Sequence, residues 1–405
     1  MTNAVQEQLN HPDVQDLIKN KTTCFDLVIA EHFNPATFAF SALYNCPLIG
    51  ISSLAAPLNA HDVMGNPAHP VLNPDMHLPF TDELGFFNRI QSVLHLIWFK
   101  YYYHYYFLPQ QDKIAKRYLG DNLPYVGDIE KNVSMVFTNE NLLIHPIRPN
   151  VPAVVQLGSM HIRKAKPLPK DLQKVLDAAT GGFVYFSLGS NIRSANLSLN
   201  IREEVIGALS EIPYKVLWKW EDESLPGQPK NVIIRQWLPQ QDVLGHPNIK
   251  VFVTQGGLQS MEESISKGVP LVGIPIFADQ PLNVKKMLDL GIAQAVNIKT
   301  LTKENLKAAI LEVAQNSKYR NRVKELSQQL TDVPMTGVEK AVWWSEYVIR
   351  HKGAWHLRSP AIDLPLYQYL LLDVIGFLFA IVIVIVTIVY KTVKLSIGIV
   401  KKPKH

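Results

Sequence analysis

The sequence is poor in cysteine, and the short motifs that bind metals or dinucleotide cofactors do not occur in it. Its 405 residues include two cysteines, Cys24 and Cys46, which are too few for a disulfide scaffold. There is no CxxC pair, no Cys/His spacing typical of a zinc site and no G-x-G-x-x-G. We therefore expect no metal and no cofactor, and a soluble nucleotide-dependent oxidoreductase is nearly excluded.

The body of the chain also lacks an excess of basic residues. The formal net charge is +5, from 40 Lys and Arg against 35 Asp and Glu. Five lysines follow Tyr390, so the whole excess lies in the C-terminal tail. This charge distribution gives no indication of nucleic-acid binding.

Long hydrophobic runs are absent except for one. Val374 to Tyr390 carries no charge, and together with Leu366 to Leu372 it forms an apolar stretch of roughly 25 residues, enough to cross a bilayer. The sequence predicts a transmembrane helix at 366–390 and a basic cytosolic tail at 391–405. Because positive residues favour the cytosolic side, we expect a lumenal body anchored in the endoplasmic reticulum membrane.

The N-terminus has no basic start followed by an apolar core, so it does not resemble a secretory signal. This conflicts with a lumenal body. Either the true start lies upstream of Met1 and the first domain is incomplete, or the body is not lumenal.

Short apolar runs alternate with helical patterns along most of the chain, which is typical of an α/β protein with parallel sheets. FDLVIA and CPLIGIS predict two strands of a first domain at 1–150. Six further strand candidates between FVYFSLGS and AQAVNI predict a doubly wound second domain at 151–335, and 336–365 leads to the membrane. The aromatic run WFKYYYHYYF is compatible with a core helix, with a wall for an apolar ligand or with a membrane contact.

The stretch VFVTQGGLQSMEE reads as a strand, two glycines and a helix. Helix N-terminal amides have no internal partners, and glycine lets an anion approach them closely, so a phosphate fits here. Two glycines that merely form a tight turn are the simpler alternative.

Polar residues follow four of the predicted strands, where ligands of such sheets bind. Trp237 offers a flat face for a base, although core packing is the ordinary role of tryptophan. Gln259 and Glu263 share a helix face, which suits a ribose, whereas Glu262 is explained by the helix dipole. Asp279 and Gln280 suit sugar hydroxyls. The whole candidate set also includes Ser187, Gly189, Gln240, Gln255, Gly256, Gly257 and Ser260.

The stretch from Trp237 to Asn283, WLPQQDVLGHPNIKVFVTQGGLQSMEESISKGVPLVGIPIFADQPLN, resembles the signature of the UDP-glycosyltransferases, which include the UDP-glucuronosyltransferases. The resemblance runs from about Phe25 through the transmembrane segment and implies a GT-B fold with two Rossmann-like domains. It also implies these contacts: Trp237 with uracil, Gln240 with base or ribose, Glu263 with ribose, Gln259 and Ser260 with diphosphate, Asp279 and Gln280 with the sugar. Gln255 departs from the family, where histidine is usual, but its amide can still donate to phosphate.

The resemblance implies inverting transfer without metal, in which a histidine deprotonates the acceptor and an acidic residue orients that histidine. Glu31 occupies the acidic position. The family histidine lies further upstream than the 24 residues before Phe25 allow, and His11 is in the wrong context. We expect a transferase moving glucose or glucuronate from a UDP-sugar to a small lipophilic acceptor. The alternative is a silent form that binds UDP-sugar or pairs with complete relatives as a homo- or hetero-oligomer.

Overall fold

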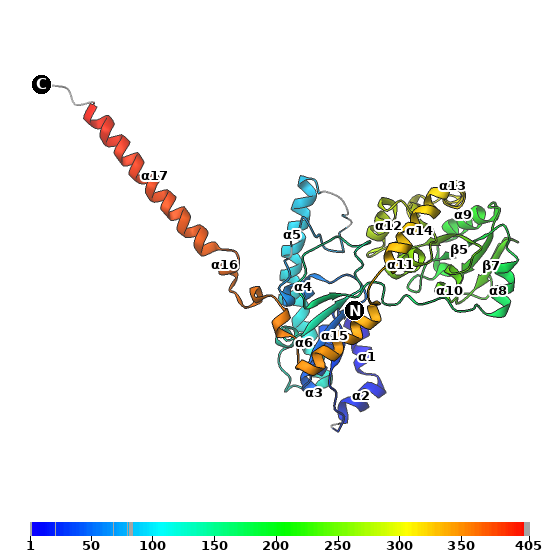
Figure 1. The fold of residues 1–405 in the computed structure, drawn as a ribbon, viewed down its shortest axis with the longest axis horizontal. Coiled ribbons are helices and arrows are strands. Elements are labelled where there is room, and N and C mark those ends of the chain that lie inside the picture. Colours follow the sequence, from blue (N-terminus) through cyan, green and yellow to red (C-terminus); the bar gives the residue numbers. More distant parts are fainter. Residues whose placement is uncertain (1, 21, 68, 79, 81–83, 401–405) are drawn as a thin grey trace.

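The protein, described by a computed structural model, has two α/β domains side by side and a long C-terminal helix that stands away from both (Figure 1). The structure describes residues 2–20, 22–67, 69–78, 80 and 84–400. The element bounds are as follows. In the first domain they are α1 (Thr2–Leu9), α2 (Pro12–Lys19), β1 (Val28–Glu31), α3 (Ala39–Tyr44), β2 (Leu48–Ser52), α4 (Leu58–Met64), α5 (Phe86–Tyr102), the π-helical turn η2 (Tyr103–Phe107), α6 (Leu108–Leu119), α7 (Val126–Glu130), β3 (Met135–Thr138) and β4 (Val154–Gln156).

The second domain alternates strands and helices more regularly. Its elements are α8 (Lys170–Asp177), β5 (Phe183–Ser187), α9 (Leu199–Ser210), β6 (Lys215–Lys219), β7 (Val232–Arg235), α10 (Gln240–Leu244), β8 (Ile249–Thr254), α11 (Leu258–Ser266), β9 (Leu271–Gly273), α12 (Gln280–Asp289), β10 (Ala293–Ala295), α13 (Lys303–Gln315) and α14 (Ser317–Thr331). The C-terminal helices are α15 (Gly337–His351), α16 (Leu366–Tyr369) and α17 (Leu372–Val400).

The first sheet has the order β1-β2-β3-β4, and all of its pairs are parallel. Its strands are short and apolar, and Ile49, Met135 and Phe137 are fully buried. Strand β4 pairs with β3 in this sheet although it follows residue 150, where the sequence predicted the domain boundary. The connection to the second domain therefore begins after Gln156.

The second sheet has the order β10-β9-β8-β5-β6-β7, again with parallel pairs throughout. Taken from β5 onward, this is the doubly wound arrangement in which the chain runs outward in both directions from one central pair. Separate hydrophobic clusters cover its two faces, one around Phe252 and Met261 and the other around Trp218 and Val253. The strand order reverses between β5 and β8, so the ligand crevice lies at their carboxyl ends.

Helix α15 returns to the first domain. A capping box at Thr336 and Glu339 fixes its start, and Val348 packs with Phe137 and Leu157 of the first sheet. Gly337 lies so close to the backbone of Leu157 that a Cβ there would be 2.6 Å from its carbonyl oxygen. The chain thus enters its C-terminal segment from the first domain.

The apolar segment at the C-terminus forms one helix whose candidate membrane span is Leu372–Ser396. The sequence predicted the span at 366–390, but residues 366–369 form the separate helix α16, and Leu371 has a positive φ of 54° between the two helices. None of the span is covered by the rest of the protein. One apolar helix long enough to cross a bilayer is therefore confirmed, with a start six residues later than predicted.

The aromatic run at 98–107 lies at the end of α5 and in η2. Only Tyr103 among its members is fully buried, where its hydroxyl donates to Glu130. Most of the other rings are exposed, so a core helix does not describe this segment.

Candidate active site

A cavity of about 730 Å³ opens at the carboxyl ends of the second sheet, where β5 and β8 meet. Its walls come from loops after β5, β7, β8 and β9, from the start of α11, and from Ser53 and Leu54 of the first domain. All predicted donor-site residues except Gly256 line it: Ser187, Gly189, Trp237, Gln240, Gln255, Gly257, Gln259, Ser260, Glu263, Asp279 and Gln280.

The floor of this cavity is glycine backbone covered by one amide side chain. Gly189 has a φ of +80°, and a Cβ on it would lie 2.2 Å from Nε2 of Gln255. A Cβ on Gly257 would lie 3.2 Å from the same nitrogen. Gln255 therefore fills the space that the two glycines leave, with its Oε1 held by the hydroxyl of Thr254 at 3.1 Å. Gly256 is turned away and packs against Val284.

Helix α11 begins at this floor, and the residue before it is a glycine. Gly257 occupies the N-cap position and supplies no side-chain acceptor, so the first amides of the helix are not capped from there. Such amides, together with the helix dipole, favour an anion. Gln259 in the first turn donates its side-chain amide to the carbonyl of Ser53 at 2.8 Å, which connects the two domains beside the cavity.

A hydrogen-bond network organises the wall where the sequence predicted a ribose contact. Gln240 donates to Glu263 Oε2 at 2.6 Å and to Ser260 Oγ at 2.9 Å, and its own Oε1 accepts from the hydroxyl of Tyr185 at 3.1 Å. Gln241 donates to the other oxygen of Glu263 at 3.1 Å. The carboxylate, which lines the cavity, is thus held in one orientation by two amide donors.

Trp237 lies at the cavity rim with 73% of its surface exposed. The core-packing alternative is wrong for this ring, and its face is available for stacking. Lys219 Nζ lies 5.7 Å from the ring centroid and donates to the carbonyl of Gly189 and to Glu221. This buried lysine lines the cavity with its charge paired to Glu221.

The loop after β9 presents Asp279 and Gln280 in a fixed conformation. Asp279 accepts from Asn283 at 2.7 Å, and Ala278 before it has a φ of +56°. Gln280 accepts from the amides of Ile276 and Phe277 at 3.0 and 3.1 Å, so its carbonyl is occupied and only its NH₂ group can reach a ligand. The acceptor role predicted for the pair therefore falls to Asp279.

Comparison with known proteins identifies the family. The family model described as UDP-glucoronosyl and UDP-glucosyl transferase matches residues 8–404. The chain belongs to the UDP-glycosyltransferase family. It is 37% identical over 382 residues to UDP-glycosyltransferase UGT5 of Dactylopius coccus, covering 93% of this chain and 72% of that protein. It is 34% identical over 381 residues to human UDP-glucuronosyltransferase 2B15, covering 93% and 71%.

Solved structures confirm the fold of this UDP-glycosyltransferase. It is similar to UDP-glucose: anthocyanidin 3-O-glucosyltransferase in complex with UDP, with a TM-score of 0.57 at 16% identity over 84% of this chain and 79% of that one. A glycotransferase of kitacinnamycin gives a TM-score of 0.56 at 20% identity, with the same coverage of both chains. The GT-B architecture expected from the sequence is confirmed, and the activity class is glucosyl or glucuronosyl transfer from a UDP-sugar.

Glu31, at the end of β1, lines a smaller cavity of about 150 Å³ next to the 730 Å³ cavity. Ser53 and Gln259 line both cavities, so the carboxyl group lies beside the donor site. Burial raises its pKa above the ordinary value, against smaller opposing effects of backbone hydrogen bonds. Its buried Oε1 has no hydrogen-bond partner among the described residues. An unpaired buried carboxylate oxygen is available to hold a catalytic partner or substrate.

The neighbouring His32 cannot act as a base toward a substrate. It is fully buried, its ring packs against Phe38, and burial lowers its pKa to about 3. His161 lines the same small cavity as Glu31 and is partly exposed, with Nε2 3.2 Å from the carbonyl oxygen of Gln259.

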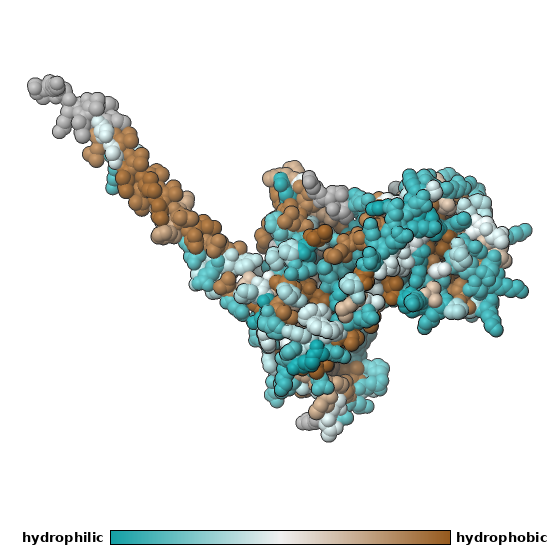
Figure 2. Space-filling model, viewed as in Figure 1, coloured by the Kyte–Doolittle hydropathy of each residue, from teal (hydrophilic) through white to brown (hydrophobic). Residues whose placement is uncertain are grey.

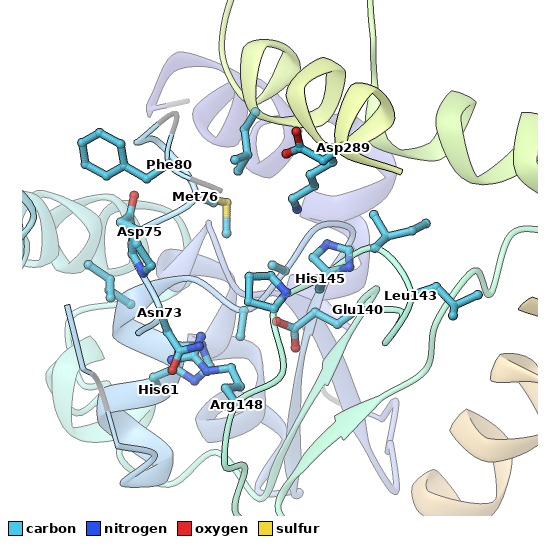
Figure 3. A pocket seen from close by; sticks show the side chains of 18 of the residues that line it. His61, Asn73, Asp75, Met76, Phe80, Glu140, Leu143, His145, Arg148 and Asp289 are labelled. Atoms are coloured by element: carbon cyan, nitrogen blue, oxygen red, sulfur yellow. The ribbon is translucent and has the colours of Figure 1, made fainter. Parts of the chain in front are cut away.

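A third cavity, of about 290 Å³, lies between the domains and is lined by Ala55 and Ala56 of the first and by residues of α12 of the second (Figure 3). Its apolar lining includes Ala55, Met76, Phe80 and Leu143, and Lys286 of α12 borders it from the second domain. Its polar edge carries Arg148, with Nη1 2.6 Å from Nε2 of a neutral His61. Burial, with a smaller effect of Arg148, lowers the pKa of His61 to about 3.

Several site residues were not found from the sequence. Lys219 stands at the carboxyl end of β6, where the rule applied to the other strands would have found it. Tyr185 lies inside a fully buried strand, and Ser53 comes from the other domain, so no local pattern marks either of them.

Proposed function

We propose that the UDP moiety binds in the 730 Å³ cavity with uracil on Trp237, ribose on Glu263 and diphosphate on Gln255, Gly257 and the start of α11. The observation that carries this assignment is the convergence of an exposed ring, an oriented carboxylate and uncapped helix amides at one strand-order reversal. The transferred sugar then lies near Asp279. The helix N-terminus supplies partial positive charge to the departing diphosphate.

We propose that the acceptor is a small lipophilic alcohol or phenol bound in the 290 Å³ cavity. Its lining is largely apolar, and it adjoins the donor cavity through the consecutive residues Ser53 to Ala56. Replacing Ala55 by Trp should raise the acceptor KM and leave UDP affinity unchanged. An unchanged acceptor KM would show that the acceptor does not bind in this cavity.

Glu31 is the proposed acidic partner of the base that deprotonates the acceptor, and transfer inverts the anomeric centre. General-base assistance contributes about 10²–10⁴-fold. Because Glu31 acts through that base, Glu31→Gln should lower kcat by up to that factor without weakening UDP binding. A β-linked product from an α-linked UDP-sugar would establish inversion. Retention of configuration, or full activity of the variant, would refute this mechanism. Parallel assays with UDP-glucose and UDP-glucuronate decide the sugar.

The protein is anchored through α17 in the endoplasmic reticulum membrane, with its body in the lumen. The 25-residue span and the basic residues that end it support this orientation. Protease added to sealed microsomes should remove only the tail. Digestion of the body in intact vesicles would show that the body faces the cytosol.

A further inference from the structure

We propose that a second part of the protein contacts the bilayer: an exposed apolar surface on α5 and η2, which rests in the membrane interface beside the α17 anchor. This α5 patch consists of Phe86, Phe87, Ile90, Leu94, Ile97, Trp98, Tyr101, Tyr102, Tyr105 and Tyr106. The inference rests on the proposed anchoring by α17.

The patch is one continuous side of a helix. Phe87, Ile90, Leu94, Ile97 and Tyr101 follow one another at intervals of three or four residues, so they share one face. That face points away from the protein, and Phe87 is 81% exposed. In Figure 1 the helix projects from the first domain, and Figure 2 shows hydrophobic surface along it. A continuous apolar surface of this kind marks a membrane or protein contact.

The composition of the patch favours the membrane interface. Its first half carries phenylalanine and aliphatic residues, whereas its second half carries Trp98 and the four tyrosines. Trp and Tyr are enriched at the level of lipid headgroups because their rings are apolar and their tips polar. A helix with such a side can lie in the interface without crossing the bilayer.

The membrane anchor leaves the protein next to this patch. Lys100 and Tyr105 line the same surface cleft as Ile362 and Asp363, which precede α16 and α17. Ser359 donates its backbone amide to Met64 of α4 at 3.1 Å, and α4 is tied to α5 by the ion pair of Asp62 with Lys100 at 2.8 Å. From Ile362 to Leu372 the chain spans at most about 36 Å even when extended. The bilayer that holds α17 is therefore within reach of the α5 patch.

Lipid quenching in the full chain tests the proposal. Cys24 and Cys46 are replaced by serine, a single cysteine is introduced and labelled with an environment-sensitive fluorophore, and the protein is reconstituted in vesicles whose lipids carry a nitroxide near the head of the acyl chain. The positions are Leu94→Cys and Tyr101→Cys in the patch, Gly376→Cys in α17, and Glu203→Cys on an exposed side of α9 as the matched helical control.

We expect quenching at positions 94 and 101 several-fold above that at 203, together with strong quenching at 376. Quenching at 376 alone would overturn the patch proposal and leave the anchor intact. Loss of quenching at 376 would refute the anchor itself. Cross-linking between two copies through position 94 without lipid quenching would also overturn the proposal for the α5 patch, because a second copy would then cover the patch. UDP binding by each labelled variant verifies folding.

Discussion

Asn139 donates its side-chain amide to Oε2 of Glu262 at 2.8 Å, and this hydrogen bond joins the loop after β3 to helix α11 of the other domain. Glu262 is fully buried, and burial raises its pKa to about 7. The residue next to Glu263, the proposed ribose contact, therefore serves the contact between the domains. The sequence assigned Glu262 the compensation of the helix dipole. This assignment is wrong, because Glu262 lies beyond the first turn of α11 and its raised pKa favours the uncharged form.

The raised pKa of Glu262 predicts how stability changes with pH. The folded protein retains the proton up to about pH 7, whereas the unfolded chain loses it near 4.5. The folded state then binds more protons between these values, so the free energy of unfolding decreases as pH rises through this window. Each unit of pKa corresponds to about 1.4 kcal/mol. Glu262→Gln should remove this part of the pH dependence, as measured by denaturant midpoints from pH 5 to pH 8.

Glu130 provides an independent counterpart in the first domain. Burial also raises its pKa to about 7, although it accepts hydrogen bonds from Tyr103 at 2.6 Å and Asn59 at 3.0 Å. Glu130→Gln should reduce the slope of the free energy of unfolding against pH in the same window, independently of Glu262→Gln. If neither substitution changes the slope, both carboxyl groups are ionised in the folded protein and the argument from burial fails.

Replacing Trp237 by alanine should weaken UDP binding with little effect on folding. Base–aromatic stacking contributes about 1–3 kcal/mol, and the exposed ring adds little to the core. Isothermal titration of UDP measures the loss, and Trp237→Phe should recover most of the affinity. Trp355→Ala, which removes a half-exposed ring far from the donor cavity, is the control. Equal affinities for all four proteins would show that uracil does not stack on this ring.

Glu263→Ala should weaken UDP while leaving free pyrophosphate unaffected, because the proposed partner of the carboxylate is ribose. A hydrogen bond to a charged group contributes about 1.5–3 kcal/mol. The substitution also removes the acceptor for Gln240 and Gln241, so Glu263→Gln serves as a variant of the same size. Losses of the same size for both ligands would assign Glu263 a structural role.

The second domain could be predicted closely from the sequence, and the first only in part. Strands β5 to β10 correspond to apolar runs that end in glycine, proline or a polar cluster, and these signals are local. Strands β3 and β4 could not be predicted in this way, because β3 (MVFT) has no flanking glycine or proline and β4 (VVQ) lies in a stretch rich in proline. The positions of the donor-site residues followed from one rule about strand ends.

Their partners could not be predicted, because those partners are distant in the sequence. Gln259 was expected to meet diphosphate, yet its amide reaches the backbone of Ser53, 206 residues away. The carbonyl of Gln280 is satisfied by its own loop, which no residue pattern indicates. The residues that follow a strand can be identified from the local sequence. The hydrogen-bond partners of their side chains depend on the tertiary structure.

Gly189 and the side chain of Gln255 lie in close contact in the proposed donor cavity. A methyl group on Gly189 would overlap Nε2 of Gln255, so Gly189→Ala should displace the amide that we assign to the diphosphate. Its φ of +80° adds backbone strain of about 1–2 kcal/mol. Gly227 separates the two effects, because its φ is +76° and the nearest atom to a Cβ there, in Ile206, is 4.0 Å away. Gly227→Ala should lower stability by a similar amount and leave UDP affinity unchanged.

We expect Gly189→Ala to weaken UDP on the order of tenfold, which corresponds to about 1.4 kcal/mol. If displacement of Gln255 is the cause, the double substitution Gly189→Ala with Gln255→Ala should bind no more weakly than Gln255→Ala alone, because the overlap is then gone. If the losses of binding free energy from the two single substitutions instead add up in the double variant, the methyl group blocks the ligand directly. Unchanged UDP affinity in Gly189→Ala would remove Gln255 and Gly189 from the diphosphate site.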